Sequence, residues 1–277
     1  MSIHPLLSNR TCYHRYEIEQ GLYTPGTFLD VEPGACLDEI GISRDLSGLR
    51  VLDVGAWDGA FTFELAKRGA KVTGLDIQDP DVTVFNAVRA ILKAPVNYVC
   101  SSVYDLRVAA HGRFDIVLFA GVYYHLKSPA LALQRIREVM EDDGLLYIEG
   151  ASCSPHLAEE LSRALPGTST ECLMRIVDGF PISFFDADKK IYRHWSNWWF
   201  PTTSCLRGML CDCGFGDVEL RLRTNAFTGY THLRIDGYAR ANPIKPRPGD
   251  QQYEHEVYVR DYVSLRLLGC GGGDRAT

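Results

Sequence analysis

Short apolar runs alternate with amphipathic stretches along the middle of the chain. Runs such as Val51 to Val54 and Phe114 to Ala120 are typical of strands buried on both faces of a parallel sheet. Between them, Val84, Val88 and Leu92 recur at four-residue spacing, which predicts a helix. The pattern predicts strands over residues 51–54, 71–75, 96–101, 114–120 and 145–148, and helices over residues 81–93 and 129–141, besides one that follows Gly59.

Strands that alternate with helices imply a Rossmann-like, doubly wound α/β fold with a mostly parallel sheet. After a predicted helix over residues 201–213, we expect two antiparallel strands at one edge of the sheet, Val218 to Leu222 and Leu233 to Ala239. The predicted organisation is a lid or helical segment over residues 1–48, the α/β domain over residues 49–240, and a linker and tail over residues 241–277 that includes an amphipathic helix over residues 253–268.

Composition narrows the class of protein. The chain has 277 residues, of which 46% are hydrophobic, so it can bury one sizeable core. No apolar run reaches the roughly 18 residues of a membrane span, and the first residues lack the apolar core of a secretory signal. Nine cysteines in a long chain favour a reduced, cytoplasmic setting, and Cys211-x-Cys213 has no second pair at zinc-site spacing, so we expect no metal.

Charge argues against a nucleic-acid partner. The net charge is −6, whereas phosphate binding needs clustered Lys and Arg. The nearest basic cluster lies in the two late strands, where we expect it to form a solvated sheet face: Arg221, Arg223, Arg234 and Arg240.

The most informative motif follows the first strand. Gly55 and Gly59 bracket a tight loop, and Asp76 ends the next strand about 20 residues later, where an acidic side chain can accept hydrogen bonds from ribose hydroxyls. A dinucleotide loop needs a third glycine, and here the bulky Trp57 stands where a diphosphate would need room. A nucleoside with an amino-acid tail and no phosphate fits this loop better.

The string D-x-G-x-x-x-G from Asp53 to Gly59, with Asp76 beyond it, resembles motif I of class I S-adenosylmethionine-dependent methyltransferases. The resemblance implies S-adenosyl-L-methionine as the cofactor. It implies that Asp53 and the carbonyls of Ala120 and Gly121 meet the methionine ammonium, and that the segment SSVYDL meets adenine. The cofactor-binding residues expected from it are Asp53, Gly55, Ala56, Gly59, Asp76, Ile77, Ser102, Val103, Ala120 and Gly121.

Other segments resemble narrower groups. GVYYHLKSP, residues 121–129, is similar to a string in the transferases that carboxymethylate wobble uridine in tRNA. Three segments resemble a group of small-molecule methyltransferases that begin W-Y-H-x-I-x-L: Cys12 to Ile18, the following GLYTPG and the later NWWFPT. In this chain Cys12 replaces the leading tryptophan. This resemblance covers about residues 12–240, with a gap from 153 to 193.

The region over residues 151–200 breaks the alternation and is rich in aromatic residues. An insertion at this point lies beside the methyl donor in this fold, so we expect a cap that shapes the acceptor pocket, or a second small core. The N-terminal segment, Tyr13 to Tyr23, is expected to fold over the donor as a lid. The acceptor-binding candidates are Tyr13, Tyr16, Tyr123, Trp195, Trp198 and Trp199.

Methyl transfer to a hydroxyl or amine needs alignment, exclusion of water and a proton acceptor. His125 is the first candidate base and His14 the second, with Tyr124 as an orienting group and His194 and His232 as weaker candidates. Three functions stay open: a methyltransferase acting on an O or N atom of a small aromatic or apolar-bodied acceptor, a tRNA-modifying transferase, and a non-catalytic S-adenosylmethionine-binding protein. The sequence is compatible with a homodimer and names no acceptor.

Overall fold

The fold is described from a computed structural model, in which residues 2–189, 194–224 and 233–243 are described. The chain divides into two compact units, and the first, residues 1–242, contains the elements discussed below. The predicted tail helix over residues 253–268 lies outside the described residues. Among the described helices, none combines the length and apolar character that a membrane span requires.

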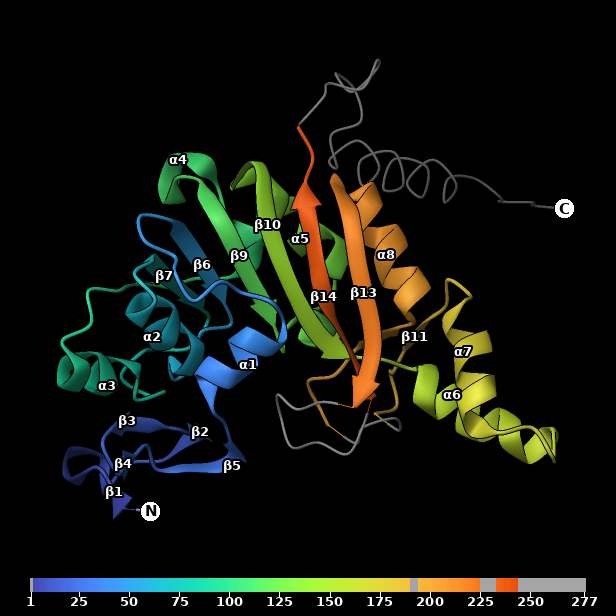
Figure 1. Ribbon diagram of the computed structural model, residues 1–277, viewed down its shortest axis with the longest axis horizontal. Helices are drawn as coiled ribbons and strands as arrows, with labels where there is room; N and C mark the ends of the chain where they lie inside the picture. Colours follow the sequence, from blue (N-terminus) through green and yellow to red (C-terminus); the bar gives the residue numbers. More distant parts are fainter. Residues whose placement is uncertain (1, 190–193, 225–232, 244–277) are drawn as a thin grey trace, which may run out of the picture. The chain divides into compact units, whose positions relative to one another are not determined.

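A mixed sheet organises the first unit (Figure 1). Within the described residues it has seven strands in the order β13-β14-β10-β9-β6-β7-β8. The central five pair in parallel, while β13 and β14 run antiparallel at one edge, as the sequence predicts. Their bounds are β6 Arg50–Val54, β7 Lys71–Asp76, β8 Asn97–Cys100, β9 Phe114–Ala120, β10 Met140–Ala151, β13 Phe215–Thr224 and β14 Leu233–Ala241.

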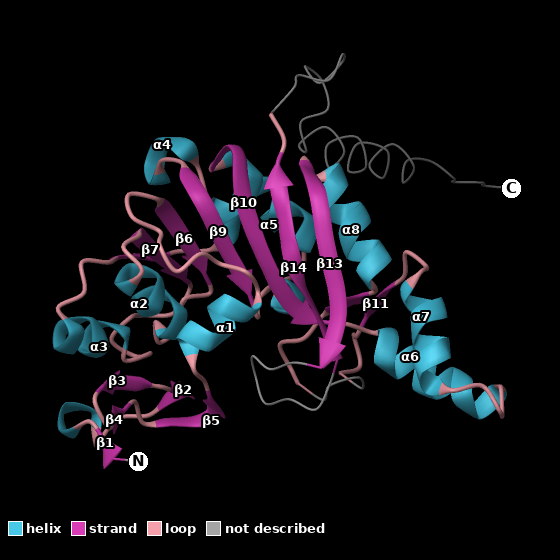
Figure 2. Ribbon diagram, viewed as in Figure 1, coloured by secondary structure: helices cyan, strands magenta, loops and turns pink. Residues whose placement is uncertain are grey.

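Helices cover both faces of this sheet (Figure 2). Alternate residues of β9 enter two different cores, Ile116 and Leu118 on one side and Val117 and Phe119 on the other. The first core is closed by α1 Pro33–Glu39, α2 Ala60–Lys67 and α3 Phe85–Leu92, and the second by α5 Pro129–Glu138 and α8 Thr203–Asp212. Short helices between strands are η2 Val103–Asp105, α4 Val108–His111 and η3 Tyr123–His125. The predicted Rossmann-like α/β architecture is therefore confirmed.

Some local expectations were wrong. The strand predicted over residues 145–148 is longer, because β10 begins at Met140 and continues through an irregularity where Asp143 adopts a positive φ of 63° and the register with β9 shifts. Residues 2–30 are mostly strands rather than helical. Apart from η1 Pro5–Leu7, the elements described there are β1 Ser2–Ile3, β2 Cys12–Arg15, β3 Glu17–Glu19, β4 Leu22–Tyr23 and β5 Gly26–Asp30.

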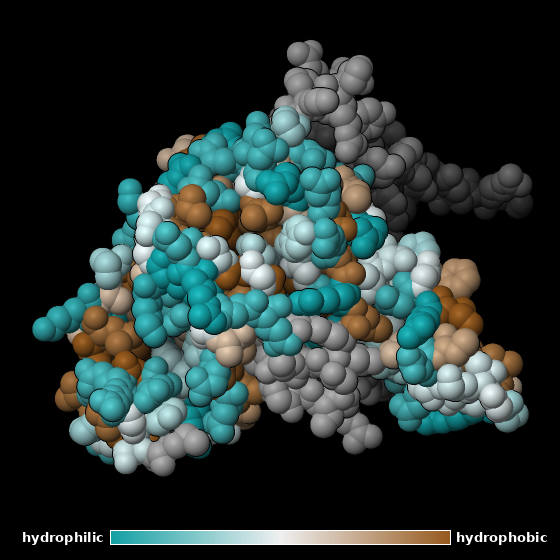
Figure 3. Space-filling view, in the orientation of Figure 1, coloured by the Kyte–Doolittle hydropathy of each residue, from teal (hydrophilic) through white to brown (hydrophobic). Residues whose placement is uncertain are grey.

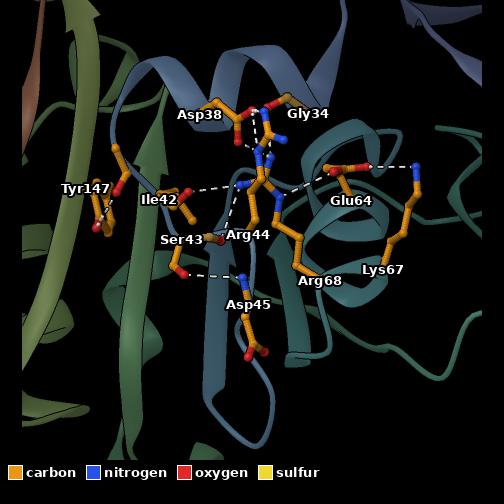
Figure 4. A network of polar contacts seen from close by, with 11 residues as sticks. Gly34, Asp38, Ile42, Ser43, Arg44, Asp45, Glu64, Lys67, Arg68 and Tyr147 are labelled. Carbon is orange, nitrogen blue, oxygen red and sulfur yellow. Dashed lines mark hydrogen bonds and ion pairs between the residues drawn. The ribbon is translucent and has the colours of Figure 1, made fainter.

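Arg68 ties α1 to α2 and so connects the N-terminal strands to the sheet domain (Figure 4). Its guanidinium donates to the carbonyl oxygens of Gly34 (2.7 Å) and Ile42 (2.9 Å) and pairs with Asp38 (3.0 Å) and Glu64 (3.2 Å). Because this cation is buried and fully engaged, it fixes the position of α1 over the sheet.

The region between β10 and α8 forms the expected aromatic-rich insertion. It contains α6 Ser154–Ala164, α7 Thr170–Asp178, and a two-stranded ribbon of β11 Ser183–Phe185 and β12 Trp199–Pro201. Phe200 is buried with Ala151 and Cys153 in a small core of its own. Apolar surface gathers on α7 (Figure 3), where Ile176 is exposed. The insertion therefore has both a core of its own and an apolar surface.

Candidate active site

The glycine loop between β6 and α2 has the tight geometry that its motif predicts. Gly55 and Gly59 adopt φ values of 84° and 85°, which residues with a Cβ atom rarely adopt. A Cβ atom at Gly55 would lie 2.4 Å from Cγ2 of Val122, which follows β9. The loop is therefore pressed against the segment after β9, and Ala56 is buried inside it.

Asp53 is a buried carboxylate directly before this loop. It accepts a hydrogen bond from the Thr62 hydroxyl at 2.6 Å. Burial raises the pKa of Asp53 to about 6, while the Thr62 hydrogen bond acts in the opposite direction. A cationic ligand group beside Asp53 would favour its ionised form, as expected for a residue that meets an ammonium.

Asp76 lies at the carboxyl end of β7, next to the glycine loop. Its two oxygens accept hydrogen bonds from the backbone N–H groups of Trp57 (3.1 Å) and Gln78 (3.0 Å). Burial raises the pKa of this carboxyl group above its usual range. Asp76 thus stabilises the loop, and each oxygen retains lone pairs that can accept from a ribose. Ile77, the next residue, is exposed.

The segment predicted to meet adenine follows β8. The Ser102 hydroxyl accepts from the N–H of Tyr104 (3.2 Å) and caps η2, so it is used within its own loop. Val103 is buried beside it. The Tyr104 hydroxyl accepts from the N–H of Ser128 (3.0 Å), which connects this loop to the start of α5. Ser128 is the N-cap residue of α5, although its side chain makes no capping hydrogen bond.

The loop after β9 carries the candidate catalytic residues. Ala120 ends β9, and Gly121, with a φ of 73°, donates its N–H to the carbonyl of Glu149 (3.0 Å). Tyr124 follows on η3, and its hydroxyl accepts a hydrogen bond from Arg234 at 3.2 Å. The Arg234 guanidinium also lies 5.0 Å from the centre of the Tyr124 ring, so one cation fixes both ring and hydroxyl.

Arg234 corrects an expectation from the sequence, which places it on a solvated sheet face. It is only 7% exposed and forms a two-point ion pair with the buried Glu149 of β10. The expectation holds better for Arg221 and Arg240, whose side chains are partly exposed. Arg234 became buried because β14 brings it beside Glu149, a partner that the sequence pattern does not reveal.

His125 is held by the cap. Its Nδ1 atom lies 2.9 Å from the Ser196 hydroxyl, which also lies 2.8 Å from Nδ1 of His194. Burial lowers the pKa of His125 to about 4, so the ring is neutral at physiological pH. His125 therefore has the protonation state that a general base needs, although a ring with so low a pKa is only a weak base. His232 lies outside the described residues.

The aromatic acceptor-binding candidates separate into two groups. Tyr123 is 1% exposed, packs on Gly150 and donates its hydroxyl to the carbonyl of Ala151 (2.7 Å). Tyr16 is buried and donates to the carbonyl of Asp58 (2.9 Å). The structure places both in the core instead of on a pocket wall. Trp195 is the opposite case, with 79% of its surface exposed.

The cap contacts the loop after β9 directly. The N–H of Trp198 donates to the Tyr124 carbonyl (2.7 Å), and the Trp199 indole N–H donates to the carbonyl of Lys127 (2.9 Å). Phe185 stacks on Trp198, with ring centres 5.8 Å apart. The candidate catalytic residues Tyr124 and His125 are therefore both fixed by the aromatic insertion.

The N-terminal strand β2 docks on the glycine loop through Asp58, a residue that the sequence analysis missed. The Asp58 carboxylate accepts from both the backbone N–H and the Nδ1 atom of His14, each at 2.7 Å. Tyr13 stacks on Phe28 and meets the edge of Trp57. The described contacts of the segment are thus with the glycine loop, and its predicted contact with residues 123–125 stays a prediction.

A groove of about 670 Å³ lies at the opposite, amino-terminal edge of the sheet. It is lined by basic side chains that include Arg50 and Arg113, but both are already engaged. Arg50 pairs with Asp115 and Glu141, and Arg113 donates to backbone carbonyls. The residues that the motif predicts to bind the cofactor lie at the carboxyl ends of the strands, where ligands bind in this kind of fold, and not in this groove.

Comparison with known proteins identifies similar domains and folds. Residues 52–148 match the family described as "Methyltransferase domain". Two relatives are ubiquinone biosynthesis O-methyltransferases. The one from Xanthomonas oryzae pv. oryzae (strain PXO99A) is 29% identical over 137 residues, which cover 47% of this chain and 57% of the relative. The one from Neisseria meningitidis serogroup A is 30% identical over 131 residues, which cover 47% and 55%. The chain thus spans little more than half the length of these curated relatives.

Solved structures share the fold. The N-terminal domain of EvdMO1, with S-adenosylhomocysteine bound, superposes with a TM-score of 0.57 and 23% identity, covering 85% of this chain and 93% of that one. A 1,6-didemethyltoxoflavin-N1-methyltransferase from Burkholderia thailandensis superposes with a TM-score of 0.51 and 17% identity, covering 76% of each chain. The fold is that of class I methyltransferases. Residues 52–148 match a methyltransferase domain, and that match together with the S-adenosylhomocysteine bound in the EvdMO1 domain supports S-adenosyl-L-methionine as the cofactor.

Proposed function

We propose that the protein transfers a methyl group from S-adenosyl-L-methionine to an O or N atom of a small, aromatic or apolar-bodied acceptor. The observation that carries the proposal is the juxtaposition of the glycine loop, which touches Val122, with the aromatic cap, which is hydrogen-bonded to Tyr124. One loop after β9 thus borders both a cofactor site and an aromatic wall. This is the arrangement that a two-substrate transfer requires.

The cofactor would be held by residues already described. Gly55 lets the loop approach the segment after β9, Asp53 offers a buried anion to an ammonium, and Asp76 offers oxygens to a ribose. When bound, S-adenosyl-L-methionine supplies a methyl group activated by its sulfonium. We propose no metal in this reaction, because methyl transfer from a sulfonium needs alignment rather than Lewis-acid activation.

The residues of this chain then align an acceptor and remove its proton. The acceptor atom forms a bond to the methyl carbon while the carbon–sulfur bond breaks, and the acceptor's proton must leave. His125 is proposed as the base, because its ring is neutral and positioned by Ser196. Tyr124, whose hydroxyl accepts a hydrogen bond from Arg234, is proposed as the group that orients the acceptor.

Trp198 and Trp199 are proposed as the acceptor-side wall. Their backbone and indole hydrogen bonds hold them against the loop of Tyr124. Rigid aromatic side chains contribute large contact area at low entropic cost, so this wall suits a flat or apolar acceptor. One similar protein is named for the small molecule 1,6-didemethyltoxoflavin and others for ubiquinone biosynthesis, which supports a small-molecule acceptor here.

The carboxylated donor of the tRNA-modifying alternative finds little support. Such a donor needs a cation for its extra carboxylate. Arg234 is already paired with Glu149, and Arg15 lies 3.6 Å from Asp30. An additional carboxylate beside Tyr124 would therefore find the charge of Arg234 already neutralised by Glu149.

Native mass spectrometry of the purified full chain tests the proposal. We expect the mass of S-adenosylmethionine or its demethylated product on the protein, and transfer of labelled methyl to at least one member of a panel of phenols and aromatic amines. Asp76→Ala is the control that should lose the bound mass. A bound carboxymethyl donor would support the tRNA alternative, and donor binding without any turnover would support a non-catalytic protein.

A further inference from the structure

Three buried carboxylates surround the proposed cofactor site. Asp53, Asp58 and Asp76 are all at most 8% exposed, and the negative charge of Asp58 raises the pKa of both of the others. This suits the ammonium of a cofactor with an amino-acid tail. It does not suit the carboxylate of that same tail, which three nearby anions would repel. A cationic side chain from elsewhere in the chain would offset this repulsion.

His14 is placed to supply this cation. It arrives on β2, outside the sheet, and is bound to Asp58 at two points, by its backbone N–H and by Nδ1. The ring is largely covered and meets the edge of Phe61. Its positive charge also lowers the pKa of Asp53, opposing the larger effect of burial. The ring thus lies within electrostatic reach of the carboxylate that faces the proposed ammonium.

The backbone around His14 is built to keep the ring there. A Cβ atom at Gly26 would lie 2.0 Å from the carbonyl carbon of His14, so only glycine lets β5 pack this closely on β2. The Thr24 hydroxyl donates to the His14 carbonyl (2.7 Å), and the Tyr16 hydroxyl donates to the Asp58 carbonyl (2.9 Å). Both partners of the His14–Asp58 pair are therefore held rigidly.

We propose that His14 recognises the α-carboxylate of the cofactor through Nε2–H, and that Asp58 is its positioning residue. The proposal rests on the proposed function and deepens it. In the proposed complex, Nδ1–H donates to Asp58 and Nε2–H donates to the α-carboxylate, which gives an alternating row of charges: Asp58, His14, cofactor. His14 is then a binding residue rather than the base, and His125 on η3 remains the base.

Calorimetry with two ligands tests this assignment on the full chain. S-adenosylhomocysteine carries the α-carboxylate, and S-adenosyl-3-thiopropylamine is the same molecule without it. We expect His14→Ala to weaken binding of the first ligand by about 10- to 100-fold, the value of a charge-assisted hydrogen bond, and to leave the second within about threefold. His111→Ala, at the opposite edge of the sheet, should bind both ligands as the unmodified protein does.

Asp58→Asn provides the second variant. It keeps an oxygen for the His14 N–H but removes the charge that holds the ring. It should therefore also weaken binding of S-adenosylhomocysteine relative to S-adenosyl-3-thiopropylamine, by a smaller factor than His14→Ala does. Equal weakening of both ligands in His14→Ala, in a protein that circular dichroism shows to be folded, would mean loop damage and overturn the proposal. Unchanged binding of both would overturn it as well. If the unmodified protein bound neither ligand, the proposed function itself would fail.

Discussion

Gly55 faces Val122 at a separation that leaves no room for a methyl group, since a Cβ atom there would lie 2.4 Å from Val122 Cγ2. Gly55→Ala should therefore lower the free energy of unfolding by ~2–4 kcal/mol, of which ~1–2 kcal/mol reflects the positive φ and the rest the clash. Chemical denaturation measures this loss. Gly55→Ala combined with Val122→Ala should recover the steric part only. Gly21→Ala, at a similar φ in open space, should show the φ cost alone, and an equal loss at both glycines would contradict the close contact.

Asp76→Ala should weaken binding of S-adenosylhomocysteine by ~1–3 kcal/mol, because hydrogen bonds between ribose hydroxyls and a charged acceptor are lost. Part of the effect will come from the loop, since Asp76 also accepts from the N–H of Trp57. Asp79→Ala, an exposed acidic residue three positions later, is the matched control and should bind normally. Unchanged affinity in Asp76→Ala would remove the ribose assignment.

Asp53 should couple cofactor binding to proton release. Its pKa is raised to about 6, chiefly by burial, and an ammonium beside it will lower that value. Around pH 5 to 6, binding of S-adenosylhomocysteine should therefore release up to one proton, and affinity should increase as the pH rises through about 6. Calorimetry in two buffers with different ionisation enthalpies counts the proton. The same count in Asp53→Asn would show that another group is responsible.

His125 should make stability depend on pH. Its pKa falls from 6.5 to about 4 in the folded protein, mainly because burial disfavours the charged ring. Between these values the unfolded chain binds the proton and the folded chain does not, so stability increases with pH in this window. The contribution is complete above about pH 6.5 and is lost as the pH falls towards 4. His125→Gln should show a flatter pH dependence of the unfolding free energy, and identical slopes in the two proteins would contradict the buried neutral ring.

Arg68 and Arg44 both contact Asp38, yet their variants should differ widely. The Arg68 side chain is 5% exposed and that of Arg44 is 85% exposed. Arg68→Met removes a buried cation and leaves Glu64 and two carbonyls without their donor, at an expected cost of ~3–5 kcal/mol. Arg44→Met removes an exposed pair and should cost under ~1 kcal/mol. Thermal unfolding of the two variants compares them, and similar midpoints would show that the network in Figure 4 is not a structural anchor.

The sheet domain was predictable because its signals are local. Phe114 to Ala120 was predicted as a strand and is β9 with the same bounds, since a run with six apolar residues out of seven before a glycine leaves little alternative. The antiparallel edge strands were also predicted correctly, although β13 begins earlier and β14 ends later than expected. The N-terminal strands were missed because they are short and paired with one another, and two- to five-residue strands carry almost no periodicity.

The parts of the candidate site that belong to a sequence motif could be predicted. The parts that depend on partners far away in the sequence could not. The glycine loop and Asp76 are recognisable from spacing alone. Asp58 lies inside that loop, but its meaning depends on His14, which is 44 residues earlier. Arg234 was expected on a solvated face because its partner Glu149 is 85 residues away in another strand. The one sequence signal that could have raised this question is Glu149 itself, a charged residue directly after the apolar run Leu145 to Ile148.

The hydrogen bond between Arg234 and Tyr124 joins residues that are 110 positions apart in the sequence. The two residues are therefore synthesised at different times during translation. The ribosome delivers the glycine loop, Asp76 and the loop of Tyr124 well before β14. The part of the site proposed for the cofactor can thus fold early. Tyr124 and Glu149 can contact Arg234 only after β14 has paired with β10. Synthesis interrupted before residue 233 would yield a chain that has the glycine loop but lacks the arginine that is hydrogen-bonded to Tyr124. Under the proposed function, methyl transfer would therefore require the finished sheet.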